Sequence, residues 1–499
     1  MSKHRETRRN WLKSTGVGGL ALGAGAFLPG RSAVPGRSRP VDAGSRRQLF
    51  LDDFWFDSSR NLELALHRPV ARETALESDR PWEAEGSHYS SVVHSGGRYQ
   101  MCYRAGRRTC YAESGDGIRW TKPNLGLHSF RGSRDNNILG GAELHNASQI
   151  LDPNEPPGSP GRYKMIASSG GLRGYVSSDG IVWNPVREAP LVTSGPFDSH
   201  NTLLWDDEHG RYVIYMRGVD TSTGGPVMWD PVGRRYVHNR PEVDKSRFKG
   251  GRRAIRRCES RDFLHWSEPE LVLARDRKDP VNLHHYTNAA VNYFRAARSF
   301  LMFPMVFYVR DDKSLPYQTG LSDIQMATSR DGVHWRRLLR KPFLSPGLDE
   351  RNWVDRNPIM GQGVVPTGPD EISMYYTELY RSPECRLRRC SLRSDGFVSV
   401  EGPYGGWGEF TTRPIIFRGS RLELNYSTSA GGGLRVELQD DTGAPLPGVG
   451  MKDCTRIVGD RTGGDVRWDP QADLSPWAGR PVRMRVLLRD AHLYAFRFH

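Results

Sequence analysis

The chain has 499 residues, of which 37% are hydrophobic and 26% charged, with a formal net charge of +14 at pH 7. This composition excludes a largely disordered chain and a bundle of membrane helices. Its 54 Gly and 33 Pro suit many short strands joined by turns. The basic charge comes from scattered arginines without a lysine-rich stripe, so we expect no nucleic-acid partner, while an anionic polymer remains a hypothesis.

The N-terminus carries the features of an export signal. The Arg8-Arg9 pair is followed by Trp11-Leu12-Lys13 and a weakly apolar run over residues 16–28, a pattern that resembles a twin-arginine signal. The run is too short to span a bilayer. We expect a signal peptide over residues 1–33, a linker over 34–47, and a periplasmic or extracellular protein. The alternative is a basic, disordered N-terminus.

A repeated motif predicts the architecture of the central part. Four copies recur at intervals of roughly 60 to 80 residues: Ser114–Trp120, Ser177–Trp183, Ser260–Trp266 and Ser329–Trp335. In each, Ser and Asp can bond the turn backbone, Gly takes the positive-φ position in three copies, and Trp opens the next strand. A fifth copy, Leu392–Val398, keeps Asp-Gly and lacks the Trp. Motifs at this period are typical of propeller blades, so their role is structural.

Short strands precede each motif, and together they predict an all-β fold. We expect a five-bladed β-propeller over residues 48–405, with a strand pair in Leu49–His67 closing the ring. Strictly alternating strands such as Leu422–Tyr426 and Val482–Leu488 then predict a β-sandwich over residues 406–499.

The cysteines and histidines indicate no cofactor. Cys102 with Cys110, or Cys385 with Cys390, could form a disulfide, or the thiols could stay free and buried; Cys258 and Cys454 complete the six. No zinc spacing is present. His145, His200 and His285 occupy equivalent points on three blades and could surround a structural cation in the channel, but hydrogen-bonding roles are the simpler interpretation.

Several segments resemble a known group of proteins. They are Leu49–Phe54, Lys122–Leu127, Asp135–Ile138, Tyr286–Ala289, Arg393–Phe397 and Arg489–Phe498. Together they resemble exported bacterial proteins of planctomycete type that are named as glycosyl hydrolases, and more distantly the invertase, levansucrase and arabinanase superfamily of five-bladed propellers. The resemblance implies cleavage or transfer of glycosidic bonds by carboxylates around the propeller's central funnel. The invertase motifs Trp-x-Asn-Asp-Pro and Arg-Asp-Pro are absent, so no catalytic residue is carried over.

Propeller geometry indicates where a site would lie, because inner strands begin, and second strands end, at one face of the ring. Glycoside hydrolysis needs a proton donor and a second carboxylate. We expect Glu378 to be the general acid, because it ends an apolar strand where burial would raise its pKa. Asp198 is the predicted nucleophile or base, and Asp355 beside Arg356 the predicted stabiliser. Each carboxylate taken singly could equally be a salt bridge or turn cap.

Polar residues at the same face are the predicted substrate contacts. They are Glu85, His88, His145, Asn146, His200, Asn201, His285, Tyr286, Asn288 and Arg356. The sequence thus favours an exported glycoside hydrolase acting on a carbohydrate that is neutral or anionic. Two alternatives stay open: a non-catalytic glycan-binding propeller, and a polysaccharide lyase in which Tyr286 and His285 supply the base and the charge neutraliser.

Overall fold

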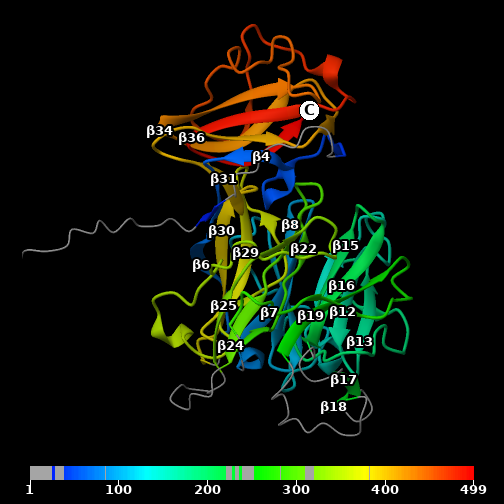
Figure 1. Cartoon of the computed structure of the whole chain (residues 1–499). Helices are drawn as coiled ribbons and strands as arrows, with labels where there is room; N and C mark the ends of the chain where they lie inside the picture. Colours follow the sequence, from blue (N-terminus) through cyan, green and yellow to red (C-terminus); the bar gives the residue numbers. More distant parts are fainter. Residues whose placement is uncertain are drawn as a thin grey trace, which may run out of the picture.

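The protein is all-β, with only short 3-10 turns beside its strands. The computed structural model describes residues 25–27, 39–84, 86–220, 227–230, 235–238, 252–280, 282–309, 320–380 and 382–499. Figure 1 shows two parts: a sheet built on the long strands β34 and β36 at one end, and smaller sheets stacked side by side at the other. The predicted signal arginines lie outside the described residues, although the strand β1 (Gly25–Phe27) pairs with β5. No helix in the described part of the chain could cross a bilayer.

Five antiparallel sheets follow one another along the chain in the order of the predicted blades. The first contains β7 (Ser87–Ser95), β8 (Arg98–Ala105), β9 (Arg108–Ser114) and β10 (Ile138–Gly140); the second β11 (Ser148–Leu151), β12 (Tyr163–Ser168), β13 (Leu172–Ser177) and β14 (Asn184–Pro185); the third β15 (Thr202–Asp206), β16 (Arg211–Asp220), β19 (Arg252–Ser260) and β20 (Glu270–Leu273). A hairpin of β17 (Val227–Asp230) and β18 (Arg235–His238) lies between β16 and β19.

The fourth sheet is split in two and the fifth has an extra strand. The fourth comprises β21 (Leu283–His285), β24 (Met305–Val309) and β25 (Gly320–Ile324), and separately β22 (Val291–Asn292), β23 (Phe300–Met302) and β26 (Ala327–Ser329). The fifth comprises β27 (Ile359–Met360), β28 (Val365–Pro366), β29 (Glu371–Glu378), β30 (Arg386–Arg393) and β6 (Val70–Glu77). The 3-10 turns are η1 (Asp53–Trp55), η2 (Pro81–Glu83), η3 (Ala142–Leu144), η5 (Glu350–Asn352) and η6 (Ser475–Trp477). Closure into a five-bladed propeller stays a prediction.

The predicted role of Leu49–His67 is wrong. The strand that joins the fifth sheet is β6, which pairs with β30 and so brings the beginning of the chain to its last blade. Leu49–His67 instead contributes β3 (Gln48–Leu49), β4 (Phe56–Arg60) and β5 (Glu63–Leu66) to the C-terminal sheet. Register in a sheet is set by burial of one face, and the apolar side chains of this segment are buried against that sheet.

The C-terminal part is one nine-stranded sheet. Its other strands are β31 (Val398–Gly402), β32 (Gly408–Thr412), β34 (Leu422–Gln439), β35 (Asp460–Asp465), β36 (Arg483–Phe498) and β1, while β2 (Val41–Gly44) pairs separately with β33 (Ile415–Phe417). The register of β34 against β36 shifts between Thr428 and Gly433, which divides both long strands in two. The sheet therefore takes strands from the beginning of the chain as well as from residues 398–498, beyond the predicted range 406–499, and a β-sandwich stays a prediction.

The repeated turns form as the sequence predicts. Ser114 accepts a hydrogen bond from the Gly117 amide at 2.9 Å, and Asp116 accepts from Ile118 and Arg119 at 2.8 Å each. The copies at Asp179, Asp262 and Asp331 bond in the same manner. Three copies have glycine at the positive-φ position, and the remaining copy forces Phe263 to φ +67°.

The motif tryptophans join neighbouring sheets. Trp120 packs edge-on against Tyr375 of the fifth sheet at 5.3 Å between ring centroids, and Trp335 packs against Tyr215 of the third at 5.4 Å. Each tyrosine hydroxyl donates to the glycine carbonyl of the same turn, at 2.5 Å. These contacts confirm the structural role predicted for the motif.

A buried polar network crosses the centre, where the inner strands β7, β11, β15, β22 and β27–β28 meet. Gln362 accepts from Ser148 at 2.5 Å and Ser91 at 3.1 Å, and it donates to the Leu203 carbonyl at 2.5 Å. Asn288 accepts from Thr202 at 2.5 Å. Four sheets thus share hydrogen bonds at one level, which holds their inner strands together.

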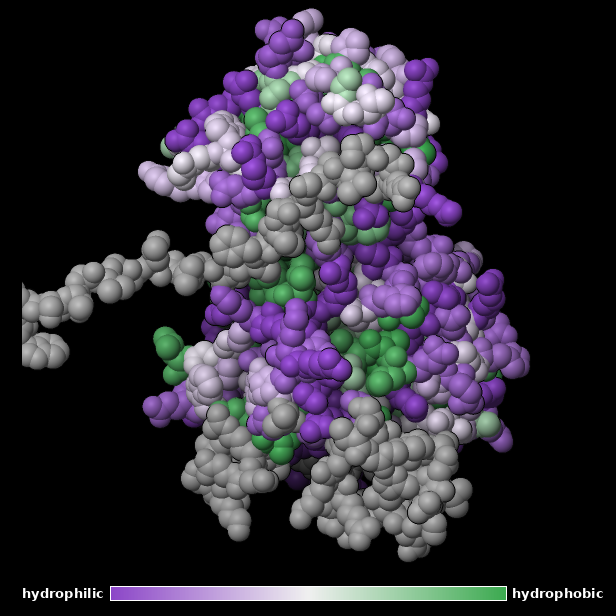
Figure 2. Space-filling model, viewed as in Figure 1, coloured by the Kyte–Doolittle hydropathy of each residue, from purple (hydrophilic) through white to green (hydrophobic). Residues whose placement is uncertain are grey.

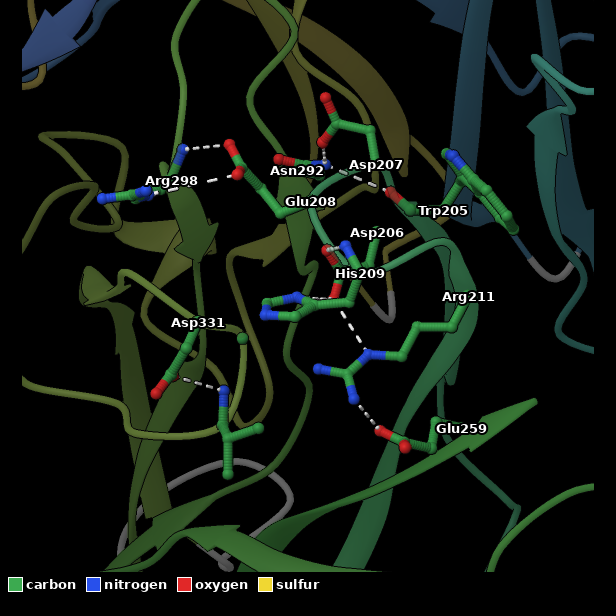
Figure 3. A network of polar contacts seen from close by, with 12 residues as sticks. Trp205, Asp206, Asp207, Glu208, His209, Arg211, Glu259, Asn292, Arg298 and Asp331 are labelled. Atoms are coloured by element: carbon green, nitrogen blue, oxygen red, sulfur yellow. Dashed lines mark hydrogen bonds and ion pairs between the residues drawn. The ribbon is translucent and has the colours of Figure 1, made fainter. Parts of the chain in front are cut away.

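At the C-terminal ends of these strands lies an apolar cavity of about 400 Å³, lined by residues of all five sheets, among them Val92, Ile150, Leu204, Val291 and Val364. Beside it, side chains tie the third sheet to the fourth. Figure 3 shows Asn292 donating to the Trp205 carbonyl and to Asp207, at 3.2 and 2.6 Å. In the same view Glu208 accepts a hydrogen bond from the backbone amide of Arg298. Asp206 accepts from His209 and Arg211 in the same network.

This face turns toward the nine-stranded sheet. Arg330 and Arg336 of the fourth repeat pair with Asp52 and Asp53, at 2.9 and 2.6 Å. The surface drawn in Figure 2 is mainly hydrophilic, with apolar residues in small patches.

All six cysteines are buried and free, and burial raises the pKa of the Cys102 thiol to about 12. The disulfide alternatives are therefore not formed in this structure.

Candidate functional site

Three tyrosines, four arginines and two aspartates gather at the N-terminal ends of the inner strands, on the other side of the polar network from the cavity. We call them the tyrosine–arginine cluster. Its members are Tyr89, Tyr286 and Tyr380; Arg104, Arg217, Arg253 and Arg356; and Asp198 and Asp355. They come from four of the five sheets and the segments before them. This is the face at which the sequence places a site.

Tyr286 is the centre of one half of the cluster. The guanidinium carbons of Arg253 and Arg217 lie 5.1 and 5.6 Å from the centroid of its ring, within the range of cation–π attraction. Burial disfavours the charged form of Arg356, but the opposing effects of Tyr286 and Asp355 are larger. The pKa of Arg356 therefore lies above its usual range. Three guanidinium groups therefore surround one phenol.

Tyr89 is the centre of the other half. Its ring stacks on His200 with centroids 5.5 Å apart, and Arg104 lies 5.9 Å from the ring centroid. His88 packs edge-on against Tyr89 and Tyr380, at 4.8 and 5.4 Å. Tyr89 has φ +51°, a strained value for a bulky residue, which fits a position fixed by its surroundings.

The two aspartates occupy contrasting environments. The Asp198 side chain is 71% exposed and pairs with the buried Arg217. The Asp355 side chain is only 1% exposed, and one of its oxygens accepts from Nε and Nη2 of Arg356, at 2.9 and 2.8 Å. The structure thus brings Asp198, Asp355 and Arg356 into one cluster, with an accessible carboxylate and a buried one. Such a contrast is typical of carboxylates with different tasks.

The histidines beside the cluster are held neutral. Burial and then Arg104 lower the pKa of His145 to about 4, with a smaller contribution from Arg107 and against the opposing effect of Asp198. Burial also lowers the pKa of His200 to about 4. His88 lies well below its usual range because of burial and then Arg104. These imidazoles therefore act as hydrogen-bonding or packing groups at neutral pH.

The same shifts predict how stability depends on pH. A histidine with a lowered pKa in the folded state binds a proton more readily when unfolded, so its contribution is complete above the unfolded value of about 6.5 and is lost as pH falls toward 4. We expect the urea midpoint to rise from pH 4.5 to pH 7, measured by tryptophan fluorescence. The lowered pKa values of carboxylates such as Asp331 act in the same direction only at lower pH. A midpoint that stays level over this range would contradict the buried, neutral histidines.

Three predicted asparagines position their neighbours. Asn146 accepts from Arg104 at 3.0 Å, and Asn201 accepts from the backbone amide of Arg217 at 3.1 Å. Asn288 lies deeper, in the central polar network, so it holds strands together and does not line the cluster. Glu85 lies outside the described residues.

Glu378 is not part of the cluster. Its side chain is 4% exposed, and its carboxylate pairs with Arg386 at 2.6 Å and Arg388 at 3.3 Å, both on the neighbouring strand β30. Both partners of this carboxylate are guanidinium groups of β30, so its oxygens are engaged in ion pairs apart from the cluster. The burial of this position was predicted from the sequence, but the environment opposes the predicted role as general acid.

This placement leads to a prediction for Glu378→Gln. We expect a loss of roughly 1.5 to 3 kcal/mol of folding free energy, the usual value of hydrogen bonds to charged groups. Because the cluster is untouched, kcat on any cleaved glycan should change by less than about threefold, a free-energy difference below about 0.7 kcal/mol. Urea unfolding and initial rates measure both. A loss of kcat by orders of magnitude, with stability preserved, would restore Glu378 as the general acid.

His285 also lies apart from the other predicted histidines. It is fully buried, and burial together with Arg337 lowers its pKa to about 3. Successive residues of a strand face opposite sides, so His285 points away from Tyr286. His145, His200 and His285 therefore do not surround a common point. The pairing of His285 with Tyr286 in a lyase site is likewise not supported.

A metal site is not indicated at the cluster by its chemistry, since arginine and neutral tyrosine are poor ligands. Elsewhere, ligand atoms of Glu423, Asp465 and His499 lie within 4.8 Å of one another in the nine-stranded sheet. Glu423 already pairs with Arg47 at 2.5 Å, and Asp465 with His499 at 3.3 Å. Partnered, mostly exposed groups of this kind give no reason to assign a cation.

Sequence reasoning missed five members of the cluster: Tyr89, Arg104, Arg217, Arg253 and Tyr380. The sequence contained a signal for the arginines, because each lies within an apolar strand or directly after one, as Arg217 does after Tyr212–Met216. Asp323 was also missed; burial raises its pKa to about 6 despite the opposing Arg68. It lies on β25, beside Tyr308.

No family model and no curated protein matches this chain. Solved structures do show likeness. A thermostable family-43 glycoside hydrolase has a TM-score of 0.41 at 15% identity, covering 64% of this chain and 93% of that one. An N-acetylgalactosamine deacetylase from F. plautii, in complex with blood group B trisaccharide, has 0.42 at 16%, covering 67% and 96%.

A third structure extends over more of the chain. A family 43 arabinoxylan arabinofuranohydrolase from Bacillus subtilis, in complex with cellotetraose, has a TM-score of 0.39 at 12% identity, covering 86% of this chain and 99% of that one. Scores and identities this low assign neither a reaction nor a substrate to this chain. The function is therefore inferred from the cluster.

Proposed function

We propose that this protein is an exported glycan-acting enzyme that hydrolyses glycosidic bonds at the tyrosine–arginine cluster. In this proposal a five-bladed propeller carries the site, a C-terminal β-sandwich supports it, and the protein acts in the periplasm or outside the cell. The observation that carries the proposal is the joining of Asp198 and Asp355 to one set of tyrosines and arginines.

The two aspartates have separate roles. Asp198, exposed and beside His145, is the nucleophile or the base that activates water. Asp355, buried and paired with Arg356, is the stabiliser of the positive charge that the sugar ring develops in the transition state. The buried rings of Tyr89 and Tyr286 hold the guanidinium groups of Arg104, Arg217 and Arg253 in place.

The test is a degradation screen of the signal-free protein against neutral and anionic polysaccharides, with reducing ends as the readout. Reducing ends released by the wild type and lost in Asp198→Asn support the proposal. Binding of a glycan without release from any substrate would instead support the non-catalytic alternative.

One observation favours a polysaccharide lyase as the second candidate. Tyr286 lies among Arg217, Arg253 and Arg356, and such guanidinium groups would pair with the carboxylate of a uronate bound beside the phenol. In a lyase, Tyr286 would take the proton beside a uronate carboxylate, a carbon–carbon double bond would form, and the glycosidic carbon–oxygen bond would break without water. The unsaturated product absorbs in the ultraviolet, which hydrolysis products do not.

A further inference from the structure

Arg104 differs from the other arginines of the cluster in its partners. Arg217 pairs with Asp198, and Arg356 with Asp355. Arg104 donates from Nε to the Gly106 carbonyl at 2.7 Å and from Nη1 to Asn146 at 3.0 Å. Within the described residues no carboxylate lies at ion-pair distance from it, and its side chain is fixed over the Tyr89 ring. A guanidinium group that is held in place by neutral partners can still pair its charge with an anionic ligand.

The electrostatic effect of these arginines is visible on the surrounding groups. Besides burial, the charge of Arg104 lowers the pKa of both His88 and His145. Burial and then Arg253 lower the pKa of His284 to about 4. Burial and Arg217 lower the pKa of Arg253 itself to about 10. The potential over this face is therefore positive, in spite of Asp198 and Asp355.

Positive charge and aromatic surface lie together here. Arg104 lies over Tyr89, and Arg253 over Tyr286. Asp198 lies near the same groups as Arg104, because the charges of both shift the pKa values of Tyr89 and His145. A sugar bound at the exposed Asp198 would thus have the guanidinium of Arg104 close to the proposed reacting carboxylate. Guanidinium groups bind carboxylate and sulfate oxygens through paired hydrogen bonds.

We infer that the cluster takes an acidic sugar, and that Arg104 binds its carboxylate or sulfate ester next to Asp198. The inference rests on the proposed glycan function and narrows its substrate to anionic glycans. A neutral glycan would leave the charge of Arg104 without a counterpart in the complex. A uronate and a sulfated sugar offer the same chemistry, and binding assays with each tell them apart.

The first test measures binding by calorimetry in the Asp198→Asn protein, which prevents turnover. The probes are an oligogalacturonate, a sulfated oligosaccharide and a neutral oligosaccharide of equal length. We expect one acidic probe to bind and Arg104→Gln to weaken it roughly 10- to 100-fold, the range for hydrogen bonds to charged groups. Arg104→Lys, which keeps the charge but loses the planar fork, should be intermediate. Arg60→Gln, at an exposed arginine of the nine-stranded sheet, is the matched control and should bind as tightly as the parent.

The second test follows the histidines by NMR and needs no turnover. Arg104→Gln should raise the pKa of His145 above about 4, because one of the charges that lower it is removed. Binding of the acidic probe to the parent should also raise it, since the added anion offsets Arg104. An unchanged His145 titration in both experiments would contradict a bound anion at Arg104.

The outcomes separate this inference from the proposed function. Equal binding of acidic and neutral probes, unaffected by Arg104→Gln, overturns the inference while hydrolysis can stand. Acidic probes that bind through Arg104 but are never cleaved by the wild type overturn the hydrolase and support the inference. No binding of either acidic probe overturns the inference directly.

Discussion

Replacing Asp198 by Asn should lower kcat/KM on a cleaved glycan by roughly 10²- to 10⁴-fold, the usual contribution of a group that transfers protons in the transition state. The substitution keeps the size of the side chain and removes the negative charge and the basic oxygen. The Asp198 side chain is 71% exposed but its partner Arg217 is buried, so the loss of the charged acceptor should also lower Tm. Initial rates and a thermal melt measure the two effects.

Asp207→Asn provides the matched control. Asp207 is also a partly exposed aspartate, 41% exposed and paired with Arg46, but it lies at the opposite ends of the inner strands. It should keep the wild-type rate. If Asp198→Asn retained more than about a tenth of the activity, too little for a proton-transfer role, the reacting carboxylate would have to be sought elsewhere.

The largest effect on stability is expected for Lys122→Met. Lys122 is buried against Glu83, with Nζ to Oε2 at 2.7 Å, and it also donates to the Glu77 carbonyl at 2.6 Å. Glu83 is fully buried and accepts from Tyr103 as well. Without the lysine, the buried carboxylate loses its cation, which typically costs about 3 to 5 kcal/mol. Urea unfolding of the full chain, followed by fluorescence, measures the loss.

The double variant Lys122→Met with Glu83→Gln tests the cause. Removing the carboxylate charge along with its partner should recover part of the lost stability, whereas independent effects would add. Lys278→Met, at an exposed lysine, should change the midpoint little. A loss below about 1 kcal/mol for Lys122→Met would show that Glu83 is stabilised by other groups, because only an exposed pair contributes so little.

Local features were predictable from the sequence. The Ser and Asp of each repeat bond atoms two or three residues away, so the turn is encoded within the motif and forms even where Phe263 replaces glycine. The alternating apolar residues likewise predicted strands in the right places. The expected propeller topology predicted that Asp198 and Asp355 would lie at one face, and the structure places both in the tyrosine–arginine cluster.

Pairings between distant segments were not predictable. The strand Ser373–Thr377 indicated burial of Glu378, but only the register of β29 against β30 reveals Arg386 and Arg388 beside it. Asp395 of the fifth repeat accepts from Tyr293 and Arg295, about a hundred residues earlier in the chain, at 2.9 and 3.0 Å. Arg104 contacts Asn146 and Tyr89 contacts His200, and the pattern of a single strand does not reveal such contacts between separate segments.

The pairing of β3, β4 and β5 with β31, β32 and β36 has a consequence for synthesis. The strands β3 and β4 pair with β36 and β32, so their apolar side chains have no sheet partner until almost the whole chain has been synthesised. Contacts of such high sequence separation form slowly. A protein cut before residue 406 would lack β32 and β36 and would leave β3 and β4 unpaired, prone to aggregation. The C-terminal sheet is thus the final closure of the molecule and cannot be removed as an independent appendage.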